Sequence, residues 1–86
     1  MNKRQAVARI ARAVGSPVTV ACVPNEVSLA GGYFASAQWA GATAYNSENC
    51  WQPTRGEAYE RLVHHVECRT LLIRAERFIA SLPGAR

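Results

Sequence analysis

The stretch over residues 54–82 constrains the fold of this chain most strongly, because it reads as one long helix or as two helices end to end. It begins at a capping box, in which Thr54 supplies a hydroxyl at the N-cap and Glu57 a carboxylate three residues later. Neither Pro nor Gly occurs between Glu57 and Leu82, and Pro83-Gly84 then marks the end. A helix is therefore predicted to dominate the last third of the chain.

The apolar residues of this segment fall on two opposite faces when each residue turns by about 100°. The first face carries Ala58, Leu62, Val66 and Ile73, flanked by Tyr59 and Val63. The second face, named here the C-terminal stripe, carries Cys68, Leu71, Leu72, Ala75, Phe78, Ile79 and Leu82. A helix with two apolar faces has two surfaces to cover, and only one of them need be inside its own domain.

The length of the helix indicates where the C-terminal stripe lies. A straight helix over this stretch spans about 43 Å, whereas a compact domain of 86 residues is roughly 30 Å across. The helix should therefore project by about two turns, and the stripe would expose an apolar patch of several hundred Å², which marks an interface. Its spacing fits about two heptads. We expect a homodimer, or a protein partner, to dock on Leu71, Leu72, Phe78, Ile79 and Leu82.

Two alternatives would hide the stripe. The N-terminal helix could cover it through Val7, Ile10 and Val14. The long helix could instead break near Arg69-Thr70, which would turn both apolar faces toward one core.

The rest of the chain predicts an α+β fold in a single domain, residues 1–86, with a short N-terminal helix, a three-stranded antiparallel sheet and the long C-terminal helix (αβββα). β-Branched and aromatic residues mark the strands, and glycines separate them. The predicted elements are a helix over 3–14, strands over 18–23, from 27–29 through a kink into 33–39, and over 42–45, and a loop over 46–52.

The strand over 33–39 has one face of small and aromatic residues: Tyr33, Ala35, Ala37 and Trp39. Because alanines let a helix approach closely, Leu62 and Val66 are expected to pack on this face. An alternative makes residues 36–45 helical through their alanines, but Gly41 in the middle favours strands.

Positive charge is concentrated at the start of the chain. The net charge is +4, and residues 1–25 carry Lys3, Arg4, Arg9 and Arg12 without any acid. After that point six Arg balance six Glu. The arginine face of the N-terminal helix is either a phosphate contact surface or the solvated back of the helix.

Three cysteines, Cys22, Cys50 and Cys68, form no CxxC pair, which favours reduced thiols and a cytoplasmic protein over a secreted disulfide framework. No apolar run approaches the roughly 20 residues of a membrane span. We therefore expect no membrane association.

The densest polar cluster is Glu60, His64, His65, Glu67 and Cys68. His64 and Cys68 are four residues apart, so both can face one metal ion, and Cys50 could add a ligand; a zinc site needs three or four. A Cys–His nucleophile would need a cleft and an oxyanion donor. The alternative places Cys68 in the core and the histidines at its rim. With no phosphate-binding glycine loop either, we expect no metal, no cofactor and no enzymatic activity.

Two tryptophans are candidates for contact with a partner. Trp39 lies inside the alanine-rich strand, which favours a place in the core, whereas Trp51 follows the polar run Ser47-Glu48-Asn49 and is expected to contribute to partner binding.

Two families share limited features with this chain. The order helix, three strands, helix resembles a double-stranded-RNA-binding domain, which places lysines at the start of its second helix; here residues 52–57 offer only Arg55. Strands leading into Thr54-x-x-Glu57-Ala58-x-x-x-Leu62 resemble the HicB-like antitoxin domain. We assign the chain to neither family.

These observations predict a small non-enzymatic protein-interaction module, a dimeric inhibitor or adaptor that docks on a partner through the C-terminal stripe and Trp51. Phage-encoded inhibitors, anti-CRISPR proteins included, are built at this size, which is an analogy of scale. The alternative is a small basic nucleic-acid-binding protein that uses Lys3, Arg4, Arg9 and Arg12.

Overall fold

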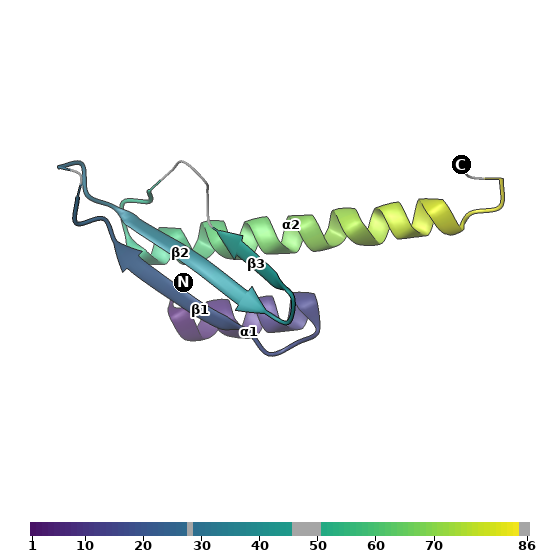
Figure 1. The fold of residues 1–86 in the computed structure, drawn as a ribbon, viewed down its shortest axis with the longest axis horizontal. Helices are drawn as coiled ribbons and strands as arrows, with labels where there is room; N and C mark the ends of the chain where they lie inside the picture. The colour runs from purple at the N-terminus through teal and green to yellow at the C-terminus, as the bar shows by residue number, and fades with distance from the viewer. Residues whose placement is uncertain (28, 46–50, 85–86) are drawn as a thin grey trace.

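The chain folds into two helices and a three-stranded sheet in the order predicted from the sequence (Figure 1). The computed structural model describes residues 1–27, 29–45 and 51–84. The α+β fold with αβββα order is confirmed. Its elements are α1 (Lys3–Val14), β1 (Thr19–Pro24), β2 (Tyr33–Trp39), β3 (Ala42–Tyr45) and α2 (Arg55–Ser81).

The strands form one antiparallel sheet in the order β1-β2-β3. Within β2, Ala35 pairs with Cys22 of β1, and Ala37 pairs with Ala44 of β3. A two-residue turn joins β2 to β3, and in it Gly41 adopts a φ of 76°, a left-handed conformation that glycine takes without the steric cost of a Cβ. The alternative helix over residues 36–45 is therefore wrong.

The connection between β1 and β2 is a loop, so the strand predicted over residues 27–29 is wrong; residue 28 itself lies outside the described residues. The backbone N–H of Asn25 donates to the carbonyl of Gly32 at 2.8 Å, and the Asn25 Oδ1 accepts from the N–H of Val27 at 3.2 Å. These local bonds close the loop, and they leave Val27 and Leu29 98% and 109% exposed. The strand was predicted because Val27 and Leu29 are apolar, but in the structure both side chains are exposed.

Both helices cover the same face of the sheet, α1 beside β1 and α2 across β2 and β3. They run side by side in the same direction: the amino group of Met1 lies 3.4 Å from Glu60 Oε1, and Arg9 Nη2 lies 2.6 Å from Glu67 Oε1. The core between the layers consists of Ala6, Ile10, Val20, Ala35, Ala37, Ala44, Ala58, Tyr59, Leu62, Val63 and Val66. The predicted packing of the first apolar face of α2 on the alanines of β2 is confirmed.

Helix α2 is continuous, so the alternative in which it breaks near Arg69-Thr70 is wrong. Thr54 caps its start, because Thr54 Oγ1 accepts from the N–H of Glu57 at 3.1 Å. At Thr70 the hydroxyl donates to the carbonyl of Val66 at 2.8 Å, which lets a polar residue sit inside the helix without interrupting it.

The second half of α2 extends beyond the rest of the molecule (Figure 1). The principal extents are 54 × 24 × 21 Å, and the radius of gyration of 15.1 Å exceeds the value of about 12 Å for a compact chain of this length. Ile73, predicted on the buried face, is 40% exposed, because the sheet and α1 do not reach that far along α2. The predicted projection is therefore present.

Candidate functional site

The projecting half of α2 exposes the C-terminal stripe to solvent. The exposed fractions are 63% for Leu71, 64% for Leu72, 65% for Phe78, 58% for Ile79 and 44% for Leu82. Cys68 is also exposed, so the alternative that placed it in the core is wrong. These side chains recur every three or four residues, so they share one side of the helix, opposite the side that packs on the sheet.

Helix α1 does not cover the stripe, so the alternative in which Val7, Ile10 and Val14 hide it is wrong. Ile10 is fully buried against the core, and Val7 and Val14 pack beside it. Because α1 begins at the same end as α2 and has only 12 residues, about 18 Å of helix, it ends at Val14 beside Thr70. A left-handed Gly15, with φ 68°, then turns the chain away.

Trp51 lies at the other end of α2 and does not join the stripe. Leu71 follows the start of α2 by sixteen residues, which is about 24 Å along the helix axis. The indole is 43% exposed and packs on Phe34 of the open sheet face, with ring centroids 5.4 Å apart at 51°. Of the loop predicted over residues 46–52, residues 46–50 with Cys50 lie outside the described residues.

The four basic residues of the N-terminal segment do not form one free surface. Lys3 and Arg4 are exposed in the first turn of α1, whereas Arg9 donates to Glu67 Oε1 at 2.6 Å. Arg12 lies near the end of α1, where it lines a cavity of about 430 Å³ together with Arg9, Glu67 and Arg74. The structure therefore separates the two ends of the predicted arginine face.

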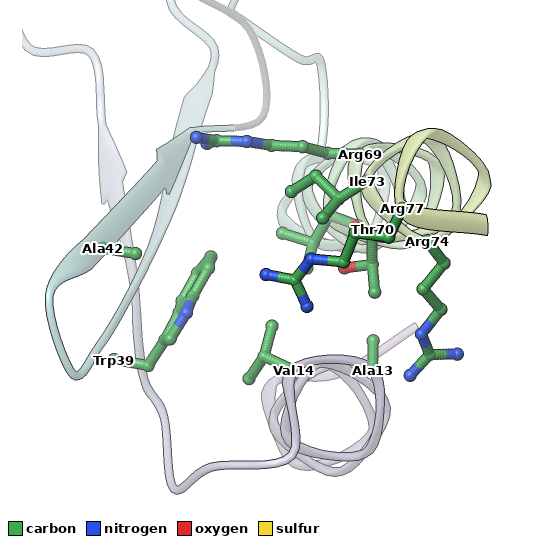
Figure 2. Close-up of a pocket in the computed structure, with 10 residues that line it drawn as sticks. Ala13, Val14, Trp39, Ala42, Arg69, Thr70, Ile73, Arg74 and Arg77 are labelled. Carbon is green, nitrogen blue, oxygen red and sulfur yellow. The ribbon is translucent and has the colours of Figure 1, made fainter. Parts of the chain in front are cut away.

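A second group of arginines surrounds a groove at the base of the projecting helix, which we name the arginine groove (Figure 2). It has a volume of about 360 Å³ and lies between the end of α1, the β2–β3 hairpin and α2. Three arginines and no acid line it. Its residues are Ala13, Val14, Trp39, Ala42, Val66, Arg69, Thr70, Ile73, Arg74 and Arg77.

This groove was not predicted from the sequence, although the sequence of α2 contains a signal for it. At about 100° per residue, Arg69, Ile73 and Arg77 continue the face of α2 that carries Leu62 and Val66. The replacement of apolar residues by arginines on that face indicates where the sheet stops covering the helix.

His64 and Cys68 lie together on the exposed side of α2, with 3.6 Å between Cys68 Sγ and His64 Nε2. Over residues 1–27, 29–45 and 51–84, no three His, Cys, Asp or Glu side chains gather closely enough to hold a metal ion. Cys50, the predicted additional ligand, is outside these ranges. Two ligands are fewer than a zinc site uses.

The surroundings of Tyr59 change its pKa. Burial raises the pKa of Tyr59 above its ordinary value of 10.0, and the neighbouring Cys22 raises it further, while Arg55 lowers it. Arg55 also stacks over the ring of Tyr33, with its guanidinium carbon 4.9 Å from the ring centroid. These contacts fix the start of α2 on the sheet and leave the far end unattached.

Comparison with protein-family models, curated proteins and solved structures finds no match to the chain. In the described part of the chain, neither helix combines the length and the apolar character needed to cross a bilayer.

Proposed function

We propose that this protein is a non-enzymatic interaction module that forms a homodimer through the C-terminal stripe. One observation carries the proposal: five large apolar side chains, 44–65% exposed, share one side of a helix that extends past its own core. A contiguous exposed apolar patch of several hundred Å² usually marks an interaction site.

The arrangement of the stripe favours a second copy of the same chain as its occupant. A two-fold interface requires a surface that complements itself. The stripe is symmetric in sequence about Ala75: Leu71 and Leu72 precede it by four and three residues, and Phe78 and Ile79 follow it by three and four.

An antiparallel pairing centred on Ala75 builds complete apolar layers. Leu71 lies level with Ile79 of the partner subunit, Leu72 with Phe78 of the partner subunit, and Cys68 with Leu82 of the partner subunit. The small Ala75 at the centre lets the helices approach closely. Two such patches bury on the order of 1,000 Å², near the lower limit for a specific interface, so we expect a dissociation constant in the micromolar range.

The dimer would act as an inhibitor or adaptor that docks on a protein partner. A phage-encoded inhibitor such as an anti-CRISPR protein is the concrete form we propose, on the analogy of size. Cys22 and Cys68 are free thiols, which supports action in the cytoplasm. Nucleic-acid binding by Lys3, Arg4, Arg9 and Arg12 has less support, because Arg9 is engaged with Glu67.

The test is the mass in solution by light scattering, at protein concentrations from about 1 μM to about 500 μM. We expect the native protein to reach twice the 9.4 kDa of one chain. Phe78→Glu should stay at the mass of one chain with unchanged helical circular dichroism, because it places a charge inside the interface.

Ala80→Glu is the matched control. It adds the same charge on the opposite side of the same helix, about 200° around from Phe78, at an exposed position, and should still dimerise. A native protein that remains a single copy over the whole range, or Phe78→Glu that dimerises as well as the native chain, would refute the proposal.

A further inference from the structure

We propose that the arginine groove binds a nucleotide unit of single-stranded nucleic acid, with the base against Trp39 and the adjoining phosphates on the arginines. The groove is distinct from the C-terminal stripe, because it lies on the opposite side of α2. The groove itself contains none of Lys3, Arg4, Arg9 and Arg12, the basic residues predicted to bind nucleic acid, although Arg9 and Arg12 line the neighbouring cavity.

The groove is shaped to take a flat group. Figure 2 shows the indole of Trp39 nearly edge-on, so one ring face is turned toward the open space, and the guanidinium of Arg77 points into that space from the other side. Val14 and Ile73 add apolar surface to the lining. Aromatic side chains and guanidinium groups are the surfaces on which bases stack, and this stacking tolerates any base.

Charge complementarity selects an anion. Arg69, Arg74 and Arg77 line the groove, and no acid does. Within the described residues Arg74 and Arg77 make no ion pair. All three arginines are exposed to solvent, and Figure 2 shows the guanidinium of Arg77 in the groove and those of Arg69 and Arg74 at its margins. Guanidinium geometry matches phosphate oxygens, so a phosphate can contact these groups.

The charge continues beyond the groove, which favours a chain of phosphates over a single anion. The neighbouring cavity of about 430 Å³ shares Ala13, Thr70 and Arg74 with the groove and adds the cation Arg12, together with Leu71 of the C-terminal stripe and the Arg9–Glu67 ion pair. Its one acid, Glu67, is already paired with Arg9. A basic track that leads away from an aromatic platform is typical of single-strand binding.

The experiment follows the fluorescence of Trp39. The chain has two tryptophans, so every protein carries Trp51→Phe, which leaves Trp39 as the sole emitter and keeps an aromatic ring against Phe34. The probe is a single-stranded oligothymidylate of about twelve nucleotides. We expect quenching on binding, and an affinity about 20-fold weaker at 200 mM than at 50 mM salt if three phosphates are contacted.

Variants test the assignment. Arg77→Ala should weaken binding about tenfold and reduce the salt slope by about 0.7, the loss of one phosphate contact. The matched control is Arg61→Ala, which removes one exposed arginine from α2 outside both cavities, and it should change the affinity less than twofold. Phe78→Glu should leave the binding intact, so failure of the dimer and failure of the groove can be distinguished.

Three results would overturn the proposal. An abasic strand of the same length that binds as tightly as oligothymidylate would exclude the stacked base. A polyglutamate peptide of equal charge that binds as tightly, with the same dependence on Arg77, would make this a site for acidic proteins. Absence of quenching at low salt would exclude a base stacked on Trp39.

Discussion

Arg9 Nη2 lies 2.6 Å from Glu67 Oε1, and this ion pair joins α1 to α2 at the point where α2 leaves the body of the protein. Val66, one residue earlier, is the last fully buried residue of α2, and every described residue from Leu71 onward is exposed. The pair therefore marks the boundary between the part of α2 that stabilises the fold and the part that is available to a partner.

The Arg9–Glu67 pair should contribute little to stability, because half of the Arg9 side chain and 35% of the Glu67 side chain are exposed to screening solvent. Arg9→Ala and Glu67→Ala should each lower the free energy of unfolding by less than about 1 kcal/mol. Urea unfolding of both variants and of the double variant measures the coupling. A coupling above about 2 kcal/mol would mean that the pair is sheltered, and that the far half of α2 folds back over it.

The direction of helix pairing can be tested with cysteines. In a protein whose Cys50 is replaced by serine, Leu82→Cys should oxidise to a covalent dimer, because the new thiol lies level with Cys68 of the partner subunit. The measurement is the mass on a non-reducing gel.

Adding Cys68→Ser to Leu82→Cys separates the two orientations. In the antiparallel dimer the crosslink should disappear, since its partner thiol is gone. If the crosslink persists, position 82 lies opposite itself, the helices are parallel, and the symmetric arrangement about Ala75 is wrong.

The stability of the protein should fall above pH 10 because of Tyr59. Burial and Cys22 raise the pKa of Tyr59 in the folded protein above its ordinary value of 10.0, so the folded state favours the neutral phenol. The contribution of Tyr59 is therefore fully present below about pH 10 and is lost as the pH rises through the folded-state pKa.

The free energy of unfolding of the native protein and of Tyr59→Phe, followed from about pH 8 to about pH 11.5, measures this effect. The difference between the two proteins should be constant below about pH 10 and should change in favour of Tyr59→Phe above it. A difference that stays constant over the whole range would contradict the raised pKa.

The sequence by itself determined the local features of this protein. Thr54 and Pro83 bound α2, Gly41 sets the hairpin turn, and the alternation of Ala35 and Ala37 defines the face on which α2 packs. These features depend on neighbours within a few residues, so periodicity and turn chemistry reveal them.

Only the tertiary structure decided which parts of α2 are covered. Because α1 starts at the same end as α2 and stops at Val14, Ile73 emerges from the core and joins Arg69 and Arg77 in a groove beside Trp39. Trp51 is held on the opposite end, far from the stripe. These relations depend on the relative lengths and directions of elements distant in sequence; the arginines on α2 indicate where its covered part ends but not which residues lie beside them.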